Sequence, residues 1–330
     1  MQYGMKNNEK ILITGVNGLL GVNTSLMLLE EGFNVVGLYR DKEKFKFVRH
    51  NRLELIKGDI SDVNCLNNIT HNCSYVVHIA ALTDQNLDYE QYYKTNVLGT
   101  KNIVSSCIKN KVKKIIYIST ANVFGYGSLR ELGNEEKTIK KPFNKSFYVR
   151  SKKEAQEYIL SKKDEIEVVV LNPTFMIGGY DSKPSSGRIV LMGLKNRIIF
   201  CPPGGKNFVC VDDVSKGIIN AIKKGRNGEA YLLANQNLNF YDFFKILKEI
   251  TTSKFLIIKI PKEVLQLMGK IGSTLRMCGV KTDISSENMK ALSINNFYSN
   301  EKALMELGLN FKPIEHGIRD AVKWFDKSSN

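Results

Sequence analysis

The chain has 330 residues, of which 43% are hydrophobic and 25% are charged, a composition typical of a globular protein with a sizeable buried core. It excludes disorder for most of the chain, and the sequence has no run of about 18 uncharged apolar residues that could cross a bilayer. Lys and Arg outnumber Asp and Glu by 48 to 33, which gives a formal net charge of +15. Because the lysines are spread along the chain without a long basic run, we attribute this charge to a solvated surface and expect no nucleic-acid partner.

The six cysteines form no C-x-x-C pair and have no histidines nearby at metal-ligand spacing. We therefore expect reduced thiols, no metal site and a cytoplasmic protein. The polar segment 1–10 lacks the apolar stretch of a signal peptide, which agrees with that location.

Short β-branched runs alternate with amphipathic helical segments over the first half of the chain, a pattern that predicts parallel strands joined by right-handed crossovers. Apolar residues recur at helical spacing from Leu19 to Leu29, and Gly32 stands where this first helix would end. A second helix has its apolar face between Ile103 and Ile108. The predicted strands form a doubly wound α/β sheet and comprise residues 11–14, 34–39, 53–57, 75–80, 114–119 and 167–172.

Beyond residue 172 this alternation is interrupted by several prolines and glycines, and helical segments dominate the C-terminal part. We therefore predict one domain over residues 1–172 and a smaller one mainly over 173–330. A segment near 208–223 is expected to return to the core of the first domain.

A glycine-rich turn, TGVNGLLG, follows the first strand in residues 14–21 and opens the first helix. Gly15 permits a tight turn, Gly18 lets the backbone approach a pyrophosphate, and Gly21 lets the helix pack closely on the strand. The anion would meet free N–H groups at the positive end of the helix. In this context the pattern predicts dinucleotide binding rather than a structural turn. The predicted contacts are Gly15, Asn17, Gly18, Leu19, Leu20 and Gly21.

The end of the second strand indicates which dinucleotide binds, because an acidic residue there accepts from a ribose 2′-hydroxyl and a basic one meets a 2′-phosphate. Arg40 stands at this end, and its guanidinium fork matches phosphate geometry. Asp41 keeps NAD(H) open as the alternative, but we favour NADP(H). Asp59, after the third strand, is a candidate acceptor for the adenine amine, with a turn-forming role as the alternative.

A carbonyl reduction needs a hydride donor, a proton donor beside the oxygen and a group that lowers the pKa of the proton donor. A Tyr with a Lys four residues later on one helix meets the last two needs, because the ammonium stabilises the phenolate. The spacing alone is weak, since four of the 14 tyrosines satisfy it, namely Tyr148, Tyr158, Tyr241 and Tyr298.

Context favours Tyr148 with Lys152. Ser119 and Thr120 end the fifth strand at the carboxyl edge of the sheet, where open α/β folds bind ligands, and Tyr148 follows them across one loop. Tyr158 lies about 15 Å further along the same helix, so we expect it to be a packing residue.

These segments together resemble the extended short-chain dehydrogenases/reductases of the NAD-dependent epimerase/dehydratase superfamily, and within them the dihydroflavonol-4-reductase-like branch. The resemblance covers nearly the whole chain and implies a Rossmann-type dinucleotide-binding domain with a substrate-binding domain. It rests on residues 14–21, 58–60, 78–81, 96–100, 118–125 (ISTANVFG), 148–152 (YVRSK), 172–178 (NPTFMIG), 208–214 (FVCVDDV), 298–308 and 324–325.

The resemblance implies that Tyr148 is the general acid, and that Lys152 binds the nicotinamide ribose and lowers the pKa of Tyr148. It favours Thr120 as the hydroxyl that holds the carbonyl, with Ser119 as the competing hydroxyl. The other cofactor contacts that it implies are Ile60, Ala80, Ala81, Asn172 and Pro173.

Three further positions follow from the same resemblance. Asn96 is expected to be a structural and proton-relay residue, with a satisfied turn Asn as the alternative. His78 is expected to serve the loop beside the cofactor. Phe124 replaces the Tyr that is common in the family, so a role for that hydroxyl is absent here.

Three functions remain open. We favour an NADP(H)-dependent reductase of a small or medium apolar carbonyl (an aldehyde, a ketone, or a sterol- or flavonoid-like compound), because residues 173–187 resemble the reductase branch. The second is an NAD-dependent nucleotide-sugar epimerase or dehydratase, in which Arg188 and Arg197 would clamp a diphosphate, although Arg40 argues against NAD. The third is a non-catalytic dinucleotide-binding protein, against which the retained catalytic residues argue.

Two expectations concern surfaces. The resemblance suggests a homodimer through helices around 97–109 and 147–162. The basic amphipathic segment 262–276 is open to two interpretations, a helix on a membrane surface or a helix whose apolar face packs on the core. We favour packing on the core and expect no stable membrane insertion.

Overall fold

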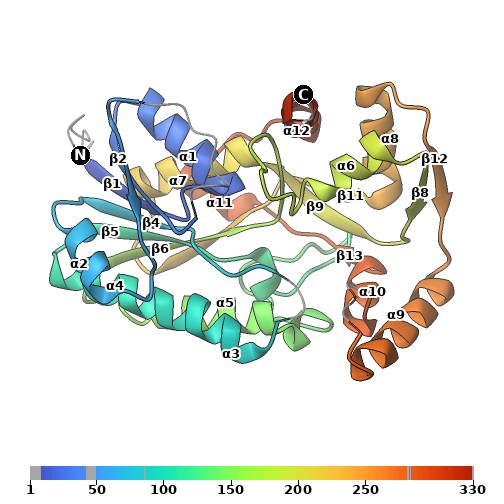
Figure 1. Ribbon diagram of the computed structural model, residues 1–330, viewed down its shortest axis with the longest axis horizontal. Coiled ribbons are helices and arrows are strands. Elements are labelled where there is room, and N and C mark those ends of the chain that lie inside the picture. The colour runs from blue at the N-terminus through green and yellow to red at the C-terminus, as the bar shows by residue number, and fades with distance from the viewer. Residues whose placement is uncertain (1–8, 42–49, 85–86, 281, 283, 329–330) are drawn as a thin grey trace.

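The computed structural model describes residues 9–41, 50–84, 87–280, 282 and 284–328. Its centre is a parallel sheet of seven strands in the order β10-β6-β5-β4-β1-β2-β3, with helices on both faces (Figure 1). The strands are β1 (Lys10–Thr14), β2 (Asn34–Tyr39), β3 (Leu53–Lys57), β4 (Tyr75–His78), β5 (Lys114–Ile118), β6 (Glu167–Pro173) and β10 (Glu229–Leu233). The predicted doubly wound α/β class is confirmed.

The six predicted strands are all present, with ends that shift by one or two residues, but the sheet has a seventh strand, β10, that the sequence did not reveal. β10 pairs in parallel with β6 at the edge of the sheet. Its five residues, EAYLL, lie in the stretch where the regular strand and helix alternation is interrupted, so the periodicity gave no signal for it.

The helices form two layers because successive side chains of each strand point to opposite faces. Ile11 and Ile13 of β1 belong to the core under one layer, and Leu12 belongs to the core under the other. The first layer contains α1 (Leu19–Glu30), α7 (Val211–Lys224) and α11 (Glu301–Leu307). The second contains α2 (Val63–Thr70), α4 (Gly99–Lys109) and α5 (Phe147–Leu160), with α3 (Tyr89–Tyr92) and the π-helix η1 (Tyr93–Leu98) leading into α4.

A third core surrounds Phe208, Phe243 and Phe255 at the carboxyl side of the main sheet. Phe208 stacks on Phe243 with ring centroids 4.4 Å apart. Two small sheets and three helices build this core: β7 (Phe175–Ile177), β9 (Gly205–Cys210), β11 (Gln236–Asn239) and β13 (Asn295–Asn296); β8 (Ile198–Cys201) with β12 (Leu256–Lys259); and α6 (Arg188–Lys195), α8 (Phe240–Thr251) and α12 (Ile314–Ser328).

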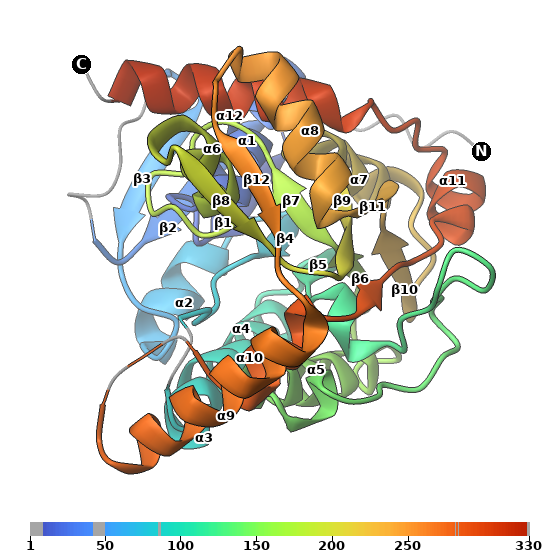
Figure 2. The same cartoon turned by 90° about the vertical axis from the view of Figure 1, so that its right-hand side faces the viewer.

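The helices α9 (Lys262–Met277) and α10 (Ser286–Leu292) pack on each other beside this core and face the viewer in Figure 2. Among the helices that the structure describes, none has the length and apolar character to span a membrane.

β10 is an edge strand, and a carboxylate caps its outer side. Glu135 Oε1 accepts a hydrogen bond from the backbone N–H of Leu232 at 2.7 Å. Unpaired groups on an edge strand are a template for pairing with another chain, and a buried N–H without a partner is costly. Glu135 therefore satisfies a backbone donor that no neighbouring strand reaches.

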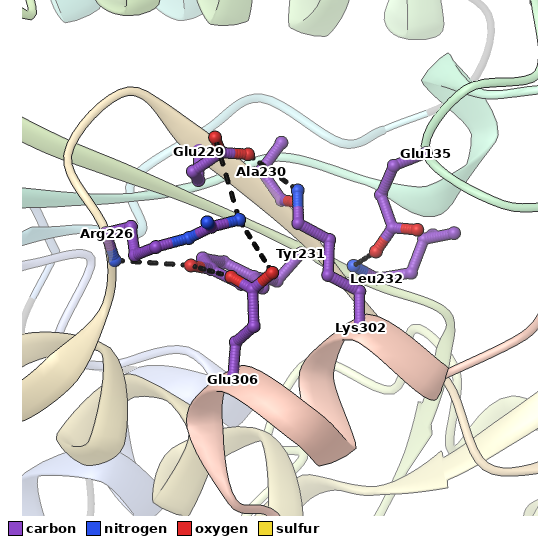
Figure 3. A network of polar contacts seen from close by, with 8 residues as sticks. All are labelled: Glu135, Arg226, Glu229, Ala230, Tyr231, Leu232, Lys302 and Glu306. Carbon is purple, nitrogen blue, oxygen red and sulfur yellow. Dashed lines mark hydrogen bonds and ion pairs between the residues drawn. The ribbon is translucent and has the colours of Figure 1, made fainter.

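Helix α11 covers the same strand through charged side chains (Figure 3). Lys302 Nζ lies 2.7 Å from Glu229 Oε2. Glu306 accepts from the Tyr231 hydroxyl at 2.8 Å and pairs with Arg226 at 2.6 Å. This network ties α11 to the sheet edge.

We expect Glu135→Ala to lower the free energy of unfolding by about 1–3 kcal/mol, because the Leu232 N–H loses a charged acceptor. Urea denaturation followed by circular dichroism measures this change. The exposed neighbour Glu136 provides the control, and Glu136→Ala should stay within about 0.5 kcal/mol of wild type. Equal effects of the two substitutions would contradict the capping role.

Candidate active site

Three glycines in the turn between β1 and α1 have different geometric roles. Gly15 has a φ of +70°, and a Cβ there would lie 2.9 Å from Ala80 Cα. A Cβ on Gly21 would lie 2.2 Å from the Gly15 carbonyl oxygen, so only glycine lets α1 approach the strand this closely. A Cβ on Gly18 would have that same oxygen as its nearest neighbour, at 3.5 Å, so the space in front of Gly18 is open. The expected turn at Gly15 and close packing at Gly21 are therefore present, and the open space at Gly18 leaves room for the expected phosphate.

The predicted cofactor contacts around this turn differ in their solvent exposure. Gly18 is exposed at the start of α1, and no side chain caps this helix end. Asn17 is half-buried and donates to the Asp41 carbonyl oxygen at 3.1 Å, which joins the turn to the end of β2. Leu19 is half-buried, whereas the Leu20 side chain is buried in the core, so only its backbone faces the turn.

Arg40 lies at the end of β2 with its side chain 70% exposed, and its Nη1 is 3.8 Å from Asp59 Oδ2. An exposed pair at this distance contributes little. Asp59 Oδ1 accepts from the Ser61 backbone N–H at 2.9 Å, which is the bond of a turn-forming Asp. Ile60 is buried, and its side chain packs beneath Gly99, where a Cβ would lie 2.4 Å from Ile60 Cδ1.

A buried chain of hydrogen bonds connects β1, β4 and α4. His78 Nδ1 lies 2.7 Å from Thr14 Oγ1, and His78 Nε2 lies 3.0 Å from Thr100 Oγ1. Thr100 Oγ1 uses its proton to donate to the Asn96 carbonyl oxygen at 2.6 Å, so it accepts from His78 Nε2–H. His78 is therefore the neutral Nε2–H tautomer, and burial lowers its pKa to about 3.

The Thr14 hydroxyl holds the loop after β4. Thr14 Oγ1 accepts from the backbone N–H groups of Ile79 and Ala80 at 3.2 and 3.1 Å. Ala80 and Ala81 are half-buried in this loop, and Ala80 abuts Gly15. His78 thus positions the loop beside the glycine turn, as expected for this residue.

The Asn96 amide connects this loop to α5. Its Oδ1 accepts from the Leu82 N–H at 2.7 Å, and its Nδ2 donates to the Leu82 carbonyl oxygen at 3.1 Å and to Ser151 Oγ at 2.9 Å. Ser151 Oγ in turn donates to the Tyr148 carbonyl oxygen at 2.7 Å. Asn96 is therefore fully satisfied by structural bonds, and it fixes the helix turn that carries Tyr148.

Lys152 is buried on α5 and points at the end of β5. Its Nζ donates to the Ile118 carbonyl oxygen at 2.7 Å and lies 4.2 Å from the centre of the Tyr117 ring. Burial lowers the pKa of Lys152 to about 7. No carboxylate within the described residues forms an ion pair with Lys152, so desolvation acts on the ammonium without compensation by an opposite charge.

Tyr148 is half-buried at the first turn of α5, and its ring centroid lies 6.2 Å from that of Tyr92. Burial, with a smaller effect from Tyr92, raises the pKa of Tyr148 to about 12. We expected Lys152 to lower this pKa. In the structure Lys152 is bonded to the Ile118 carbonyl oxygen, and desolvation of the phenol outweighs any effect of the ammonium.

The two candidate hydroxyls at the end of β5 differ in their bonding. Thr120 Oγ1 accepts from the Asn122 backbone N–H over a long 3.4 Å. Ser119 Oγ is buried and has no hydrogen-bond partner among the described residues. Buried polar atoms are normally satisfied, so an orphaned hydroxyl at the carboxyl edge of the sheet is consistent with a ligand beside it.

Asn172 and Pro173 end β6 next to these hydroxyls, and both are buried. Asn172 Nδ2 donates to the Thr120 carbonyl oxygen at 3.0 Å and to Gln156 Oε1 at 2.8 Å. Asn172 Oδ1 lacks a partner in the described part of the chain. The structure thus brings the predicted residues of β5, α5 and β6 together.

Two residues of the alternative prediction do not form a shared site, and two residues of the site were not predicted from the sequence. Arg188 begins α6 and Arg197 follows its end, and both are exposed, so the diphosphate clamp of the epimerase alternative has no support from a shared position. Ser151 and Gln156 were missed because neither belongs to a spacing pattern. Their roles follow from the side of α5 that faces Asn96 and Asn172, which only the packed structure defines.

The burial of Lys152 predicts how the free energy of unfolding depends on pH. Its pKa falls from 10.5 to about 7 on folding, so between these values the unfolded chain binds more protons than the folded protein. The free energy of unfolding of the cofactor-free protein should therefore rise with pH across this window, and Lys152→Met should flatten the rise. Urea denaturation at several pH values measures it. The half-buried neighbour Lys153 gives a control, because Lys153→Met should keep the wild-type slope. An unchanged slope in Lys152→Met would exclude the buried ammonium as its source.

Comparison with known proteins agrees with this geometry. A family model described as the NAD dependent epimerase/dehydratase family matches residues 11–234. A protein of Synechocystis sp. that carries the name of a dihydroflavonol 4-reductase is 27% identical over 328 residues, which cover 95% of this chain and 93% of the relative. Sterol demethylase protein B of Methylococcus capsulatus is 25% identical over 321 residues, with 95% and 97% of the two chains covered.

The crystal structure of gox2253 superposes on the fold with a TM-score of 0.83 at 27% sequence identity, covering 97% of this chain and 99% of that one. The glycine turn, the parallel sheet and the long family match lead to one conclusion. The chain belongs to the NAD-dependent epimerase/dehydratase family of extended short-chain dehydrogenases/reductases and is an NAD(P)-dependent enzyme acting on a small molecule.

Proposed function

We propose that the protein is an NADP(H)-dependent oxidoreductase that reduces a small or medium apolar carbonyl, such as an aldehyde, a ketone, or a sterol- or flavonoid-like compound. The observation that carries this proposal is the bond from Lys152 Nζ to the Ile118 carbonyl oxygen, two residues before Thr120. This bond holds α5, the helix of Tyr148, against the carboxyl edge of the sheet that also carries the open glycine turn. Relatives named as a dihydroflavonol 4-reductase and a sterol demethylase protein support an apolar substrate.

The residues of this chain fit a bound dinucleotide. The open space at Gly18 and the uncapped start of α1 suit a pyrophosphate, and the exposed Arg40 suits a 2′-phosphate. Ser119 Oγ and Asn172 Oδ1, which have no partner among the residues that the structure describes, are polar atoms available at the other end of the site. When bound, the cofactor supplies the hydride.

Tyr148 donates the proton to the carbonyl oxygen. A phenol with a pKa raised to about 12 is protonated at neutral pH, which is the form that donates. Thr120 Oγ1, which accepts a long 3.4 Å bond from Asn122 N–H, positions the carbonyl oxygen, and Ser119 is the second hydroxyl available for that task. Lys152 binds the nicotinamide ribose, and its ammonium stabilises the phenolate that remains after proton transfer.

We also propose that the two parts of the chain bind different molecules. Residues 1–172 bind the dinucleotide, and residues 173–330 mainly bind the substrate. The return of the segment near 208–223 to the core of the main sheet is supported by the packing of α7 with α1, whereas Phe208 at its start lies in the core around Phe243. A homodimer through α4 and α5 is supported by the exposed apolar side chains of Leu98 and Phe147 beside them.

A nucleotide-sugar epimerase or dehydratase is the second candidate, and Lys206 favours it. Lys206 is half-buried, burial lowers its pKa to about 8, and it has no ion pair or hydrogen bond within the described residues. It pairs in register with Asn296, which donates to Asn122 Oδ1 close to Thr120. A cation in this position would attract a phosphorylated substrate.

We expect Tyr148→Phe to lower kcat by about 10²- to 10⁴-fold on an aldehyde or ketone substrate found by screening, because the proton donor is lost. Its dissociation constant for NADPH should stay near that of wild type. Tyr158→Phe is the matched control, since Tyr158 lies on the same helix and also precedes a Lys by four residues, although Lys162 lies just beyond the end of α5. This variant should retain full turnover. Normal turnover in Tyr148→Phe would refute the assignment of the general acid.

We expect Arg40→Ala to weaken NADPH binding by about 10- to 100-fold while NADH binding changes little, because only NADPH carries the 2′-phosphate. Fluorescence titration of both cofactors, after a check for a co-purified one, measures the difference. Equal losses would show that Arg40 does not read the 2′-phosphate, and tightly retained NAD would favour the epimerase or dehydratase.

A further inference from the structure

The two-stranded sheet of β8 and β12 has one face that the described residues leave uncovered. Leu256 lies opposite Ile198 in the register, and Ile258 lies opposite Phe200. The side chains of all four residues are exposed, with Phe200 at 59% and Leu256 at 57%. Alternate residues such as Ile199 point into the core, so the exposed apolar face follows from the pleat of the strands.

Helix α9 continues this apolar surface directly after β12. Its exposed apolar side chains recur at intervals of three or four residues, which places them on one stripe of the helix. The stripe consists of Val264, Leu267, Met268, Ile271 and Leu275. β8, β12 and α9 all lie on the side of the molecule that faces the viewer in Figure 2.

We expected the apolar face of residues 262–276 to pack on the core, and the structure shows a different contact. The helix instead buries a side that carries Leu265, Gly269 and Gly272. A Cβ on Gly272 would lie 2.4 Å from the Ile284 carbonyl oxygen, and one on Gly269 would lie 3.0 Å from Met289 Cβ. The glycines let α10 approach closely, and the larger apolar residues remain exposed.

The two chain segments that form this surface carry strongly one-sided charge. Within residues 195–201 and 254–277 the acidic residue is Glu263 alone. The basic residues of the same two segments are Lys195, Arg197, Lys254, Lys259, Lys262, Lys270 and Arg276. An apolar face bordered by cations is complementary to a bilayer surface with anionic headgroups.

We propose that β8, β12 and α9 form a docking face for anionic lipid bilayers, on which the exposed apolar side chains enter the headgroup boundary and the lysines meet lipid phosphates. A second copy of the chain fits less well, because a symmetric contact would bring the same basic residues together from both partners. The proposal is independent of the reductase activity. It is consistent with an apolar substrate that partitions into membranes.

Flotation with vesicles tests the proposal, using phosphatidylcholine alone and phosphatidylcholine mixed with phosphatidylglycerol. Wild-type protein should float with the mixed vesicles and not with phosphatidylcholine alone, and added salt should weaken the binding. The double substitution Leu267→Glu with Ile271→Glu should abolish flotation. As a matched control, Leu304→Glu with Met305→Glu alters exposed apolar residues of α11 and should leave binding unchanged.

A second variant keeps the apolar stripe and removes charge. Replacing Lys259, Lys262 and Lys270 by Gln should weaken binding to the mixed vesicles by about five-fold per lysine, or on the order of 100-fold in total. Circular dichroism and NADPH titration confirm that each variant is folded. Absence of wild-type flotation, or equal flotation of all variants, would overturn the proposal. Light scattering that shows a dimer broken by the α9 substitutions, without vesicle binding, would assign the face to a second copy.

Discussion

The hydrogen-bonded chain from Thr14 through His78 and Thr100 to Asn96 is the constraint on which the site depends. Every link is buried, and a buried polar group without a partner costs about 1–3 kcal/mol. All hydrogen bonds of this series form with one arrangement of protons, in which His78 is neutral and donates from Nε2. The series fixes the loop after β4 against the glycine turn at one end, and through Asn96 and Ser151 it fixes the first turns of α5 at the other.

In the cofactor-free protein, burial disfavours the charged forms of Lys152 and Tyr148 and leaves the Ser119 hydroxyl without a hydrogen bond from the described residues. Burial lowers the pKa of Lys152 to about 7 and raises that of Tyr148 to about 12, and Ser119 Oγ has no partner among the described residues. The desolvation of Lys152 and the unpartnered Ser119 hydroxyl oppose folding, so the surrounding core must over-determine their positions, whereas Tyr148 is neutral near pH 7 in the folded and the unfolded chain. Lys152 is held by one carbonyl oxygen and the Tyr117 ring, which leaves ammonium donors for a ligand.

Sequence periodicity predicted the parallel sheet because its strands are short apolar runs between amphipathic helices, and it predicted the glycine turn because each glycine has a separate geometric task. It failed where the outcome depends on tertiary packing. β10 lacks a distinctive pattern and becomes a strand because β6 leaves an edge that it can join. The pKa of Tyr148 depends on burial, which the Tyr and Lys spacing does not encode, and Ser151 and Gln156 gain their roles from the side of α5 that faces the site.

Amphipathic patterns and net charge have the same weakness, since both describe a segment without its surroundings. The apolar pattern of α9 fits a stripe that packs on a core as well as a stripe that faces solvent. Gly269 and Gly272 decide the outcome, because they offer α10 a closer approach than the larger apolar stripe does. Lysines spread evenly along a sequence are not spread evenly over a surface. The fold brings the segments around β8 and β12 together by direct strand pairing, so a charge that looked diffuse in the sequence is concentrated beside an exposed apolar face.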